Sequence, residues 1–90
     1  HGTADIFSLG VTFYQLLTGK LPFTGENIAQ LAYCISQARY TDPRKLRRDL
    51  PASASRIVAK ALAKAPADRY QRGADMADAL RRGMPKRKAS

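Results

Sequence analysis

The sequence predicts an all-α chain of four helices that forms part of a larger fold. Apolar residues recur at helical spacing in four segments, and Pro and Gly residues separate these segments. The first segment is apolar nearly all round, whereas the other three are amphipathic and offer too little apolar surface to enclose it. A helix of that kind belongs in the middle of a larger protein, so we expect the chain to be a fragment.

The first helix is expected over residues 5–18. Its polar residues Ser8, Thr12 and Gln15 recur at i, i+4 and i+7, so they form one narrow stripe. Asp5 can cap the N-terminus by accepting bonds from backbone N–H groups, and Gly19 is a natural C-terminal stop. The loop that follows, residues 20–25, is indicated by its Pro and Gly residues.

The second helix is expected from about residue 27 to residue 37. Asn27 with Gln30 three residues later fits a variant of the capping box. The apolar residues of this segment lie on one side of a helix, at Ile28, Leu31, Ala32 and Ile35. Residues 39–52 show no sustained periodicity, and Pro43 and Pro51 interrupt them, so we expect a long basic loop there.

The third and fourth helices are expected over residues 53–64 and 74–82. The pair Ala65-Pro66 should end the third helix, because the residue before a proline disfavours the α conformation. Met76, Ala77 and Leu80 give the fourth helix its apolar face. We expect one domain over residues 1–83, followed by a flexible basic tail over residues 84–90.

Composition excludes several classes of protein. A hydrophobic content of 44% is too high for a disordered chain, and 90 residues suit one small domain at most. The single cysteine, Cys34, gives no internal disulfide and no indication of a metal site. The longest apolar stretch, residues 6–17, is shorter than the roughly 20 residues that span a bilayer, so no membrane span is expected in this chain.

The positive charge is concentrated in the second part of the chain. The net charge is +9, and residues 39–90 carry fifteen Lys or Arg against five Asp. Basic patches attract nucleic acid, anionic lipid or acidic protein surfaces, and charge alone does not choose among them.

Four short motifs occur in an informative order. They are D-I-F-S-L-G at residues 5–10, Y-Q-L-L-T-G at 14–19, L-P-F at 21–23 and P-A-D-R-Y at 66–70. Together with four helices in this order, they resemble the last third of a eukaryotic-type serine/threonine protein kinase domain of the bacterial kind. The resemblance covers roughly residues 4–83 and implies helices F, G, H and I of the C-lobe of a kinase α+β fold, without the N-lobe and the catalytic loop.

The resemblance implies structural roles for residues of the first helix. Asp5 matches the aspartate that accepts hydrogen bonds from the backbone of the catalytic loop, and Gly10 matches a glycine that permits close packing. Leu16 and Thr12 match positions that support the stack of side chains beneath the adenine site.

The resemblance also implies roles in substrate recognition and in an ion pair. Gln15 falls where many relatives carry a glutamate that helps recognise a basic substrate. Leu21, Pro22 and Phe23 match the L-P-F loop, which with the second helix would help to form the floor of the protein-substrate groove. Arg69 matches the arginine that pairs with the glutamate of an A-P-E motif. That glutamate would lie upstream of His1, so we expect Arg69 to be solvated and its surroundings loosened.

Phosphoryl transfer in this family needs motifs that the chain lacks. There is no G-x-G-x-x-G, no H-R-D and no D-F-G, and His1 is the only histidine. We therefore expect no catalytic, cofactor-binding or metal-binding residues here, and expect the chain alone to be structural and inactive. A parent kinase would use ATP and Mg²⁺, with a protein substrate and the rest of its own kinase domain as partners. It would lie in the cytoplasm, with a membrane anchor beyond this chain as an open alternative.

Two other functions are open from the sequence. The first is a non-catalytic docking module or an inactive kinase relic, which the residues do not separate from a kinase fragment. The second, less favoured, is a basic helical module that binds nucleic acid. Its candidate contacts are Arg44, Lys45, Arg47, Arg48, Arg81, Arg82, Lys86, Arg87 and Lys88. A solvated basic loop and tail explain the same residues, so nucleic acid is not the expected partner.

Overall fold

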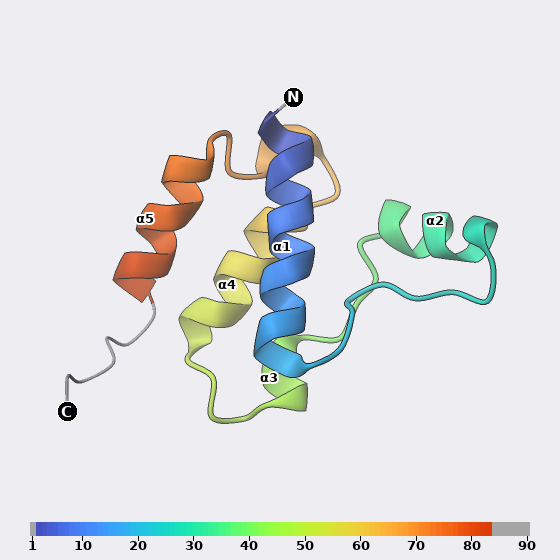
Figure 1. Ribbon diagram of the computed structural model, residues 1–90, viewed down its shortest axis with the longest axis horizontal. Coiled ribbons are helices and arrows are strands. Elements are labelled where there is room, and N and C mark those ends of the chain that lie inside the picture. The colour runs from blue at the N-terminus through green and yellow to red at the C-terminus, as the bar shows by residue number, and fades with distance from the viewer. Residues whose placement is uncertain (1, 84–90) are drawn as a thin grey trace.

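The computed structural model describes residues 2–83, and its first helix lies at the centre of the others (Figure 1). The helices are α1 (Gly2–Thr18), α2 (Ile28–Ser36), α3 (Pro43–Leu46), α4 (Ala52–Ala61) and α5 (Gly73–Gly83), with a short 3-10 helix, η1 (Pro66–Asp68), before α5. No strand occurs within residues 2–83, so the expected all-α character is confirmed. The predicted basic tail and His1 lie outside the described residues.

The core is built where α1 meets the second part of the chain. Helix α1 contacts α3, α4, α5 and η1. The α5-side cluster of buried residues comprises Ile6, Ile57, Ala61, Tyr70 and Met76. The α2-side cluster comprises Tyr14, Phe23, Val58 and Leu62. Residues of α4, or adjoining its end, belong to both clusters, so α4 provides most of the surface on which α1 rests.

The two ends of α1 differ in how well the sequence predicts them. Gly19 adopts a φ of 75°, and its N–H donates to Gln15 O at 2.8 Å, so the expected glycine stop is confirmed. The start of the helix was predicted wrongly. The helix begins at Gly2, which places Asp5 inside its first turn instead of at the N-cap. A carboxylate in the first turn still lies beside the positive end of the helix dipole.

Helix α2 stands apart from the other helices in Figure 1. Asn27 Oδ1 accepts from Gln30 N at 2.8 Å, as the capping box predicts, although the Gln30 side chain accepts from Glu26 N and does not reach Asn27. None of its residues is fully buried. The partly buried Leu31, Cys34 and Ile35 pack against the α2-side cluster, which leaves the outer surface of the helix in water.

The expected long loop over residues 39–52 contains a helix, α3, that the periodicity did not predict. Asp42 caps it by accepting from Arg44 N at 3.0 Å, and the buried Pro43 occupies its first turn. Arg47 donates to Leu17 O at 3.1 Å and so joins this segment to the end of α1. The prolines that suggested a loop do not prevent a helix here, because proline is favoured at the first helical position.

Helices α4 and α5 form a pair on one side of α1 (Figure 1). The expected third helix over 53–64 ends earlier, at Ala61, which corrects the prediction. Ala63 O accepts a hydrogen bond from Arg69 Nε at 2.9 Å, a bond that a continuing helix would have made to the backbone. The hydroxyl of Ser53 donates to Gly83 O, so the start of α4 is tied to the end of α5.

Candidate functional site: the open face of α1

One face of α1 is left in water. Asp5, Leu9, Thr12 and Leu16 lie at i, i+4, i+7 and i+11 and are all exposed, so they form a single stripe that we call the open face. Leu9 is 50% exposed and Leu16 is 77% exposed. Two exposed leucines on one stripe of a central helix indicate a surface that another structure would cover.

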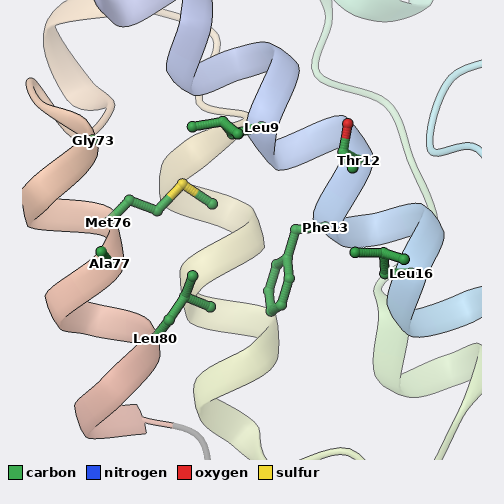
Figure 2. A pocket seen from close by; sticks show the side chains of 8 residues that line it. All are labelled: Leu9, Thr12, Phe13, Leu16, Gly73, Met76, Ala77 and Leu80. Carbon is green, nitrogen blue, oxygen red and sulfur yellow. The ribbon is translucent and has the colours of Figure 1, made fainter.

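An apolar groove runs between the open face and α5. It encloses about 230 Å³, and Figure 2 shows Leu9 of α1 and Met76 of α5 directed toward one another across it. The residues that line it are almost all apolar: Leu9, Thr12, Phe13, Leu16, Gly73, Met76, Ala77 and Leu80. Because these apolar side chains are exposed to water in the groove, their burial by a partner would be favourable.

Asp5 stands at the N-terminal end of the open face. Its side chain is exposed, and no described residue donates a hydrogen bond to its carboxylate. A carboxylate oxygen at this place can accept hydrogen bonds from a segment laid along the open face. The structure therefore leaves Asp5 available for the loop-bracing role that the resemblance implies.

The opposite face of α1 is closed and depends on Gly10. A Cβ at this position would lie 2.8 Å from Ala61 Cβ and 3.0 Å from Leu62 Cδ2. Real Cβ atoms do not approach a neighbour this closely, so the contact between α1 and α4 requires a residue without a side chain. The sequence residue singled out for close packing lies at the tightest part of that contact.

Arg69 is held at a corner formed by α1 and η1. Its Nε donates to Ala63 O at 2.9 Å, and its guanidinium lies 4.8 Å from the centroid of the Phe7 ring. The expected arginine was solvated and in loosened surroundings, whereas the observed Arg69 side chain is half-buried. The aromatic ring and the carbonyl oxygen both contact the guanidinium group and help to fix its position.

A small hollow adjoins this arginine. It encloses about 190 Å³ and is lined by Ala4, Phe7, Ile35 and Arg69. Phe7 is itself stacked on Phe23, with ring centroids 5.8 Å apart and an interplanar angle of 13°. The guanidinium therefore rests on a rigid aromatic support beside an open space.

The four residues assigned to a substrate groove do not share one environment. Gln15 and Leu21 are exposed, whereas Pro22 and Phe23 are buried. Phe23 meets Tyr40 edge to face at 5.9 Å and forms part of the α2-side cluster. Only Gln15 and Leu21 present side chains that a substrate could touch, and Pro22 with Phe23 fixes the path of the loop.

Leu9 is the member of the site that sequence reasoning missed. Its apolar type gave no reason to single it out in a segment that is apolar nearly throughout. The signal that could have found it is spacing, because Leu9 lies four residues after Asp5 and seven before Leu16.

Neither a metal-binding cluster nor a membrane-spanning helix is found among the described residues. Residues 2–83 contain no group of three His, Cys, Asp or Glu side chains that could hold a metal ion. No helix in this part of the chain combines the length and the hydrophobicity needed to cross a membrane.

Curated proteins with similar sequences are protein kinases. The chain is 44% identical over 77 residues to the tyrosine-protein kinase MasK of Myxococcus xanthus, a match that covers 86% of this chain and 12% of that protein. It is 37% identical over 73 residues to the serine/threonine-protein kinase PrkC of Bacillus subtilis, covering 81% and 11%. It is 40% identical over 79 residues to the serine/threonine-protein kinase PknB of Mycobacterium tuberculosis, covering 87% and 13%.

Solved structures agree with these relatives. A crystal structure of the Rad53 kinase domain and SCD2 superposes with a TM-score of 0.72 at 30% sequence identity, over 88% of this chain and 29% of that one. No family model matches the chain. The chain spans about an eighth of the length of the curated relatives that it matches. The chain is a portion of the helical C-lobe of a eukaryotic-type protein kinase domain of the bacterial kind.

Proposed function

We propose that this chain is the helical base of a kinase that transfers the γ-phosphoryl group of ATP to serine or threonine hydroxyls of proteins. The observation that carries the proposal is the open face of α1, a stripe with two exposed leucines on a helix otherwise packed as a core element. The stripe begins with Asp5, to whose carboxylate no described residue donates a hydrogen bond. Two of the similar proteins are named serine/threonine kinases and a third is named a tyrosine kinase. The hydroxyl class therefore needs its own measurement.

The proposed contribution of the chain is structural. Asp5 would accept hydrogen bonds from the backbone of the catalytic loop, and Leu16 and Thr12 would support the side chains beneath the adenine. Arg69, held over Phe7 beside a hollow, would pair with a glutamate brought in by another segment. Asp5, Thr12 and Leu16 are exposed, and Arg69 lies beside a hollow. A further part of the domain could therefore reach each of these side chains.

ATP and Mg²⁺ would be held by other parts of the protein. Residues 2–83 contain no cluster of three or more His, Cys, Asp or Glu side chains that could hold a metal ion, and the phosphate-binding and catalytic motifs are absent from the sequence. We propose residues 1–83 as the C-lobe portion, residues 84–90 as a basic tail, and the cytoplasm as the compartment. Gln15 and Leu21 would face the protein substrate.

The basic residues give less support to binding of nucleic acid. Arg44 Nε donates to Leu50 O at 3.0 Å, and Arg47 pairs with Asp49 at 2.7 Å besides bonding Leu17 O. Arg81 pairs with Asp78. Several candidate phosphate contacts are therefore already engaged with other groups of the chain.

The test is phosphoryl transfer by the full-length protein in which residues 1–90 occur. We expect ATP-dependent labelling of protein, with phosphoserine or phosphothreonine recovered after hydrolysis. The Asp5→Ala variant should lose activity by about a hundredfold, because a misplaced catalytic loop costs that much, while the protein still folds. The matched control is Asp68→Ala, which removes another exposed aspartate that has no side-chain partner among the described residues.

The alternatives are separated by the same assay. An inactive full-length protein would indicate a docking module or a kinase relic. Transfer catalysed by the purified 90-residue chain would overturn the structural role. Equal losses in Asp5→Ala and Asp68→Ala would show that Asp5 has no special place in catalysis.

A further inference from the structure

A second hollow lies between α4 and α5, on a side of α5 that the apolar groove does not use. It encloses about 290 Å³ where the start of α4 meets the end of α5, the two ends that lie side by side in Figure 1. The residues that line it are Ser53, Arg56, Ile57, Tyr70, Ala79, Arg82 and Gly83. We call this feature the arginine hollow.

The floor of the arginine hollow is fixed by a tight helix contact. Ser53 donates its hydroxyl proton to Gly83 O, and a Cβ on Gly83 would lie 2.9 Å from Ser53 Cβ. Tyr70 is buried beside them. The two helices therefore cannot separate or slide without breaking packing, so the side chains that they carry keep their relative positions.

Two guanidinium groups from different helices share the hollow. Arg56 comes from α4 and Arg82 from α5, and both are exposed. Lys60 lies one turn after Arg56, with its Nζ 5.3 Å from the centroid of the Tyr70 ring. Two cations thus line one concavity and a third lies against Tyr70 at its side, and no acidic residue among the described residues lines it.

The nearby acidic residues are engaged elsewhere. Asp75 pairs with Arg72 at 3.2 Å, and Asp78 pairs with Arg81. Arg56 also borders a neighbouring hollow that contains Asp42, whose carboxylate accepts from Ser55 Oγ at 2.5 Å and from Arg44 N at 3.0 Å. Among residues 2–83, no ion pair neutralises Arg56, Lys60 or Arg82.

We propose that the arginine hollow binds a phosphorylated serine or threonine side chain of a protein. A phosphate monoester carries nearly two negative charges at neutral pH, and planar guanidinium groups bind its oxygens in pairs. The choice of a phosphorylated side chain rests on the proposed function, because a serine/threonine kinase produces this group. The hollow would then hold a protein that has already been phosphorylated.

A membrane surface fits the same charges less well. Peripheral membrane helices present an apolar face beside their cations, so that both reach the bilayer. In α5 the apolar Met76 and Leu80 turn toward the groove with α1, away from the arginine hollow. The site is a concavity between two helices, which suits one side chain better than a flat lipid surface.

The test measures peptide binding by the full-length protein in which residues 1–90 occur. The probe is a fluorescein-labelled peptide with one phosphoserine among alanines and glycines, and the reference is the same peptide without phosphate. At physiological ionic strength, we expect fluorescence anisotropy to give at least about tenfold tighter binding of the phosphorylated form. The double variant Arg56→Gln/Arg82→Gln should abolish this preference.

The control removes the same charge from another place. Lys45→Gln/Arg48→Gln also removes two exposed cations that are in no ion pair among the described residues, and it should retain the preference. Equal losses in both double variants would overturn the proposal, because net charge would then explain binding. Equal binding of the two peptides would also overturn it, as would binding to phosphatidylserine vesicles without discrimination between the peptides.

The proposed phosphoserine site in the arginine hollow and the proposed kinase activity can fail separately. Phosphoryl transfer is measured on the same unsubstituted protein. A preference for phosphoserine without transfer would support the arginine hollow and refute the kinase activity. Transfer without any preference would support the kinase activity and refute the arginine hollow.

Discussion

The two long faces of α1 both carry large apolar side chains, but only one of the two faces is buried. The face toward α4 carries Ile6, Gly10 and Tyr14, which are all buried, and its closest contact leaves no room for a methyl group. The open face carries Leu9 and Leu16, which remain largely in water. The difference teaches that residues 2–83 complete one side of this helix with their own side chains and leave the other side for a different structure.

The same substitution, Leu→Ala, should lower the free energy of unfolding by different amounts at the closed face and at the open face of α1. Leu62 is 1% exposed and packs against the closed face, so Leu62→Ala should lower the free energy of unfolding of the chain by about 2–5 kcal/mol. Leu16→Ala on the open face should change it by less than about 0.5 kcal/mol. Urea unfolding followed by circular dichroism measures both.

The same pair of variants sharpens the comparison when more of the kinase domain is present. If another segment covers the open face, Leu16→Ala should become costly there, with a loss approaching that of Leu62→Ala. An effect of Leu16→Ala that stays negligible in the longer protein would mean that the open face is a true outer surface. That result would contradict the role assigned to Leu16.

Glycine substitutions test how tightly the closed face is packed. Gly10→Ala should destabilise the chain, because the overlap with Ala61 and Leu62 costs about 1–3 kcal/mol and outweighs a gain of up to about 1 kcal/mol in helix propensity. Gly73→Ala is the matched control, since nothing lies within 4 Å of a Cβ at that position. Its unfolding free energy should rise slightly or stay the same, and a stabilising Gly10→Ala would refute the close contact.

The pattern of apolar residues was enough to locate four helices, since three of them have a clear apolar side and the first is apolar nearly all round. The short α3 was missed because four residues are too few to show a period. Its signal was the pair Asp42-Pro43, a capping side chain followed by the residue favoured at the first helical position. Turn chemistry, not hydrophobicity, determines that element.

The residues of the candidate site could be predicted only in part from the sequence, for a different reason. The apolar character of residues 5–18 is a property of the sequence, but which of the two sides stays open depends on where α4 and α5 pack. The environment of Arg69 depends likewise on Phe7, a residue 62 positions away that no local pattern connects to it. Long-range contacts of this kind are invisible to spacing arguments.

The smallest predicted effect concerns a hydroxyl on the closed face. Tyr14 Oη donates to Thr41 O at 2.5 Å, so Tyr14→Phe should cost about 1 kcal/mol near neutral pH. Burial, and to a lesser degree the charge of Asp42, raises the pKa of Tyr14 above its usual 10.0. The folded state therefore keeps this proton longer than the unfolded state, so stability is full below about pH 10 and falls as pH rises through the folded-state pKa.

Removal of this hydroxyl should thus matter less in alkali. Because phenylalanine does not titrate, the stability difference between the two chains should shrink from about pH 8 to about pH 11. Burial also raises the pKa of Tyr40 and Tyr70, so part of the alkaline loss will persist in Tyr14→Phe. Tyr33→Phe, at a side chain that is 56% exposed, should change neither the free energy of unfolding near pH 8 nor its decrease in alkali. A difference that is constant with pH would refute the prediction, because an ionised Tyr14 cannot donate to Thr41 O.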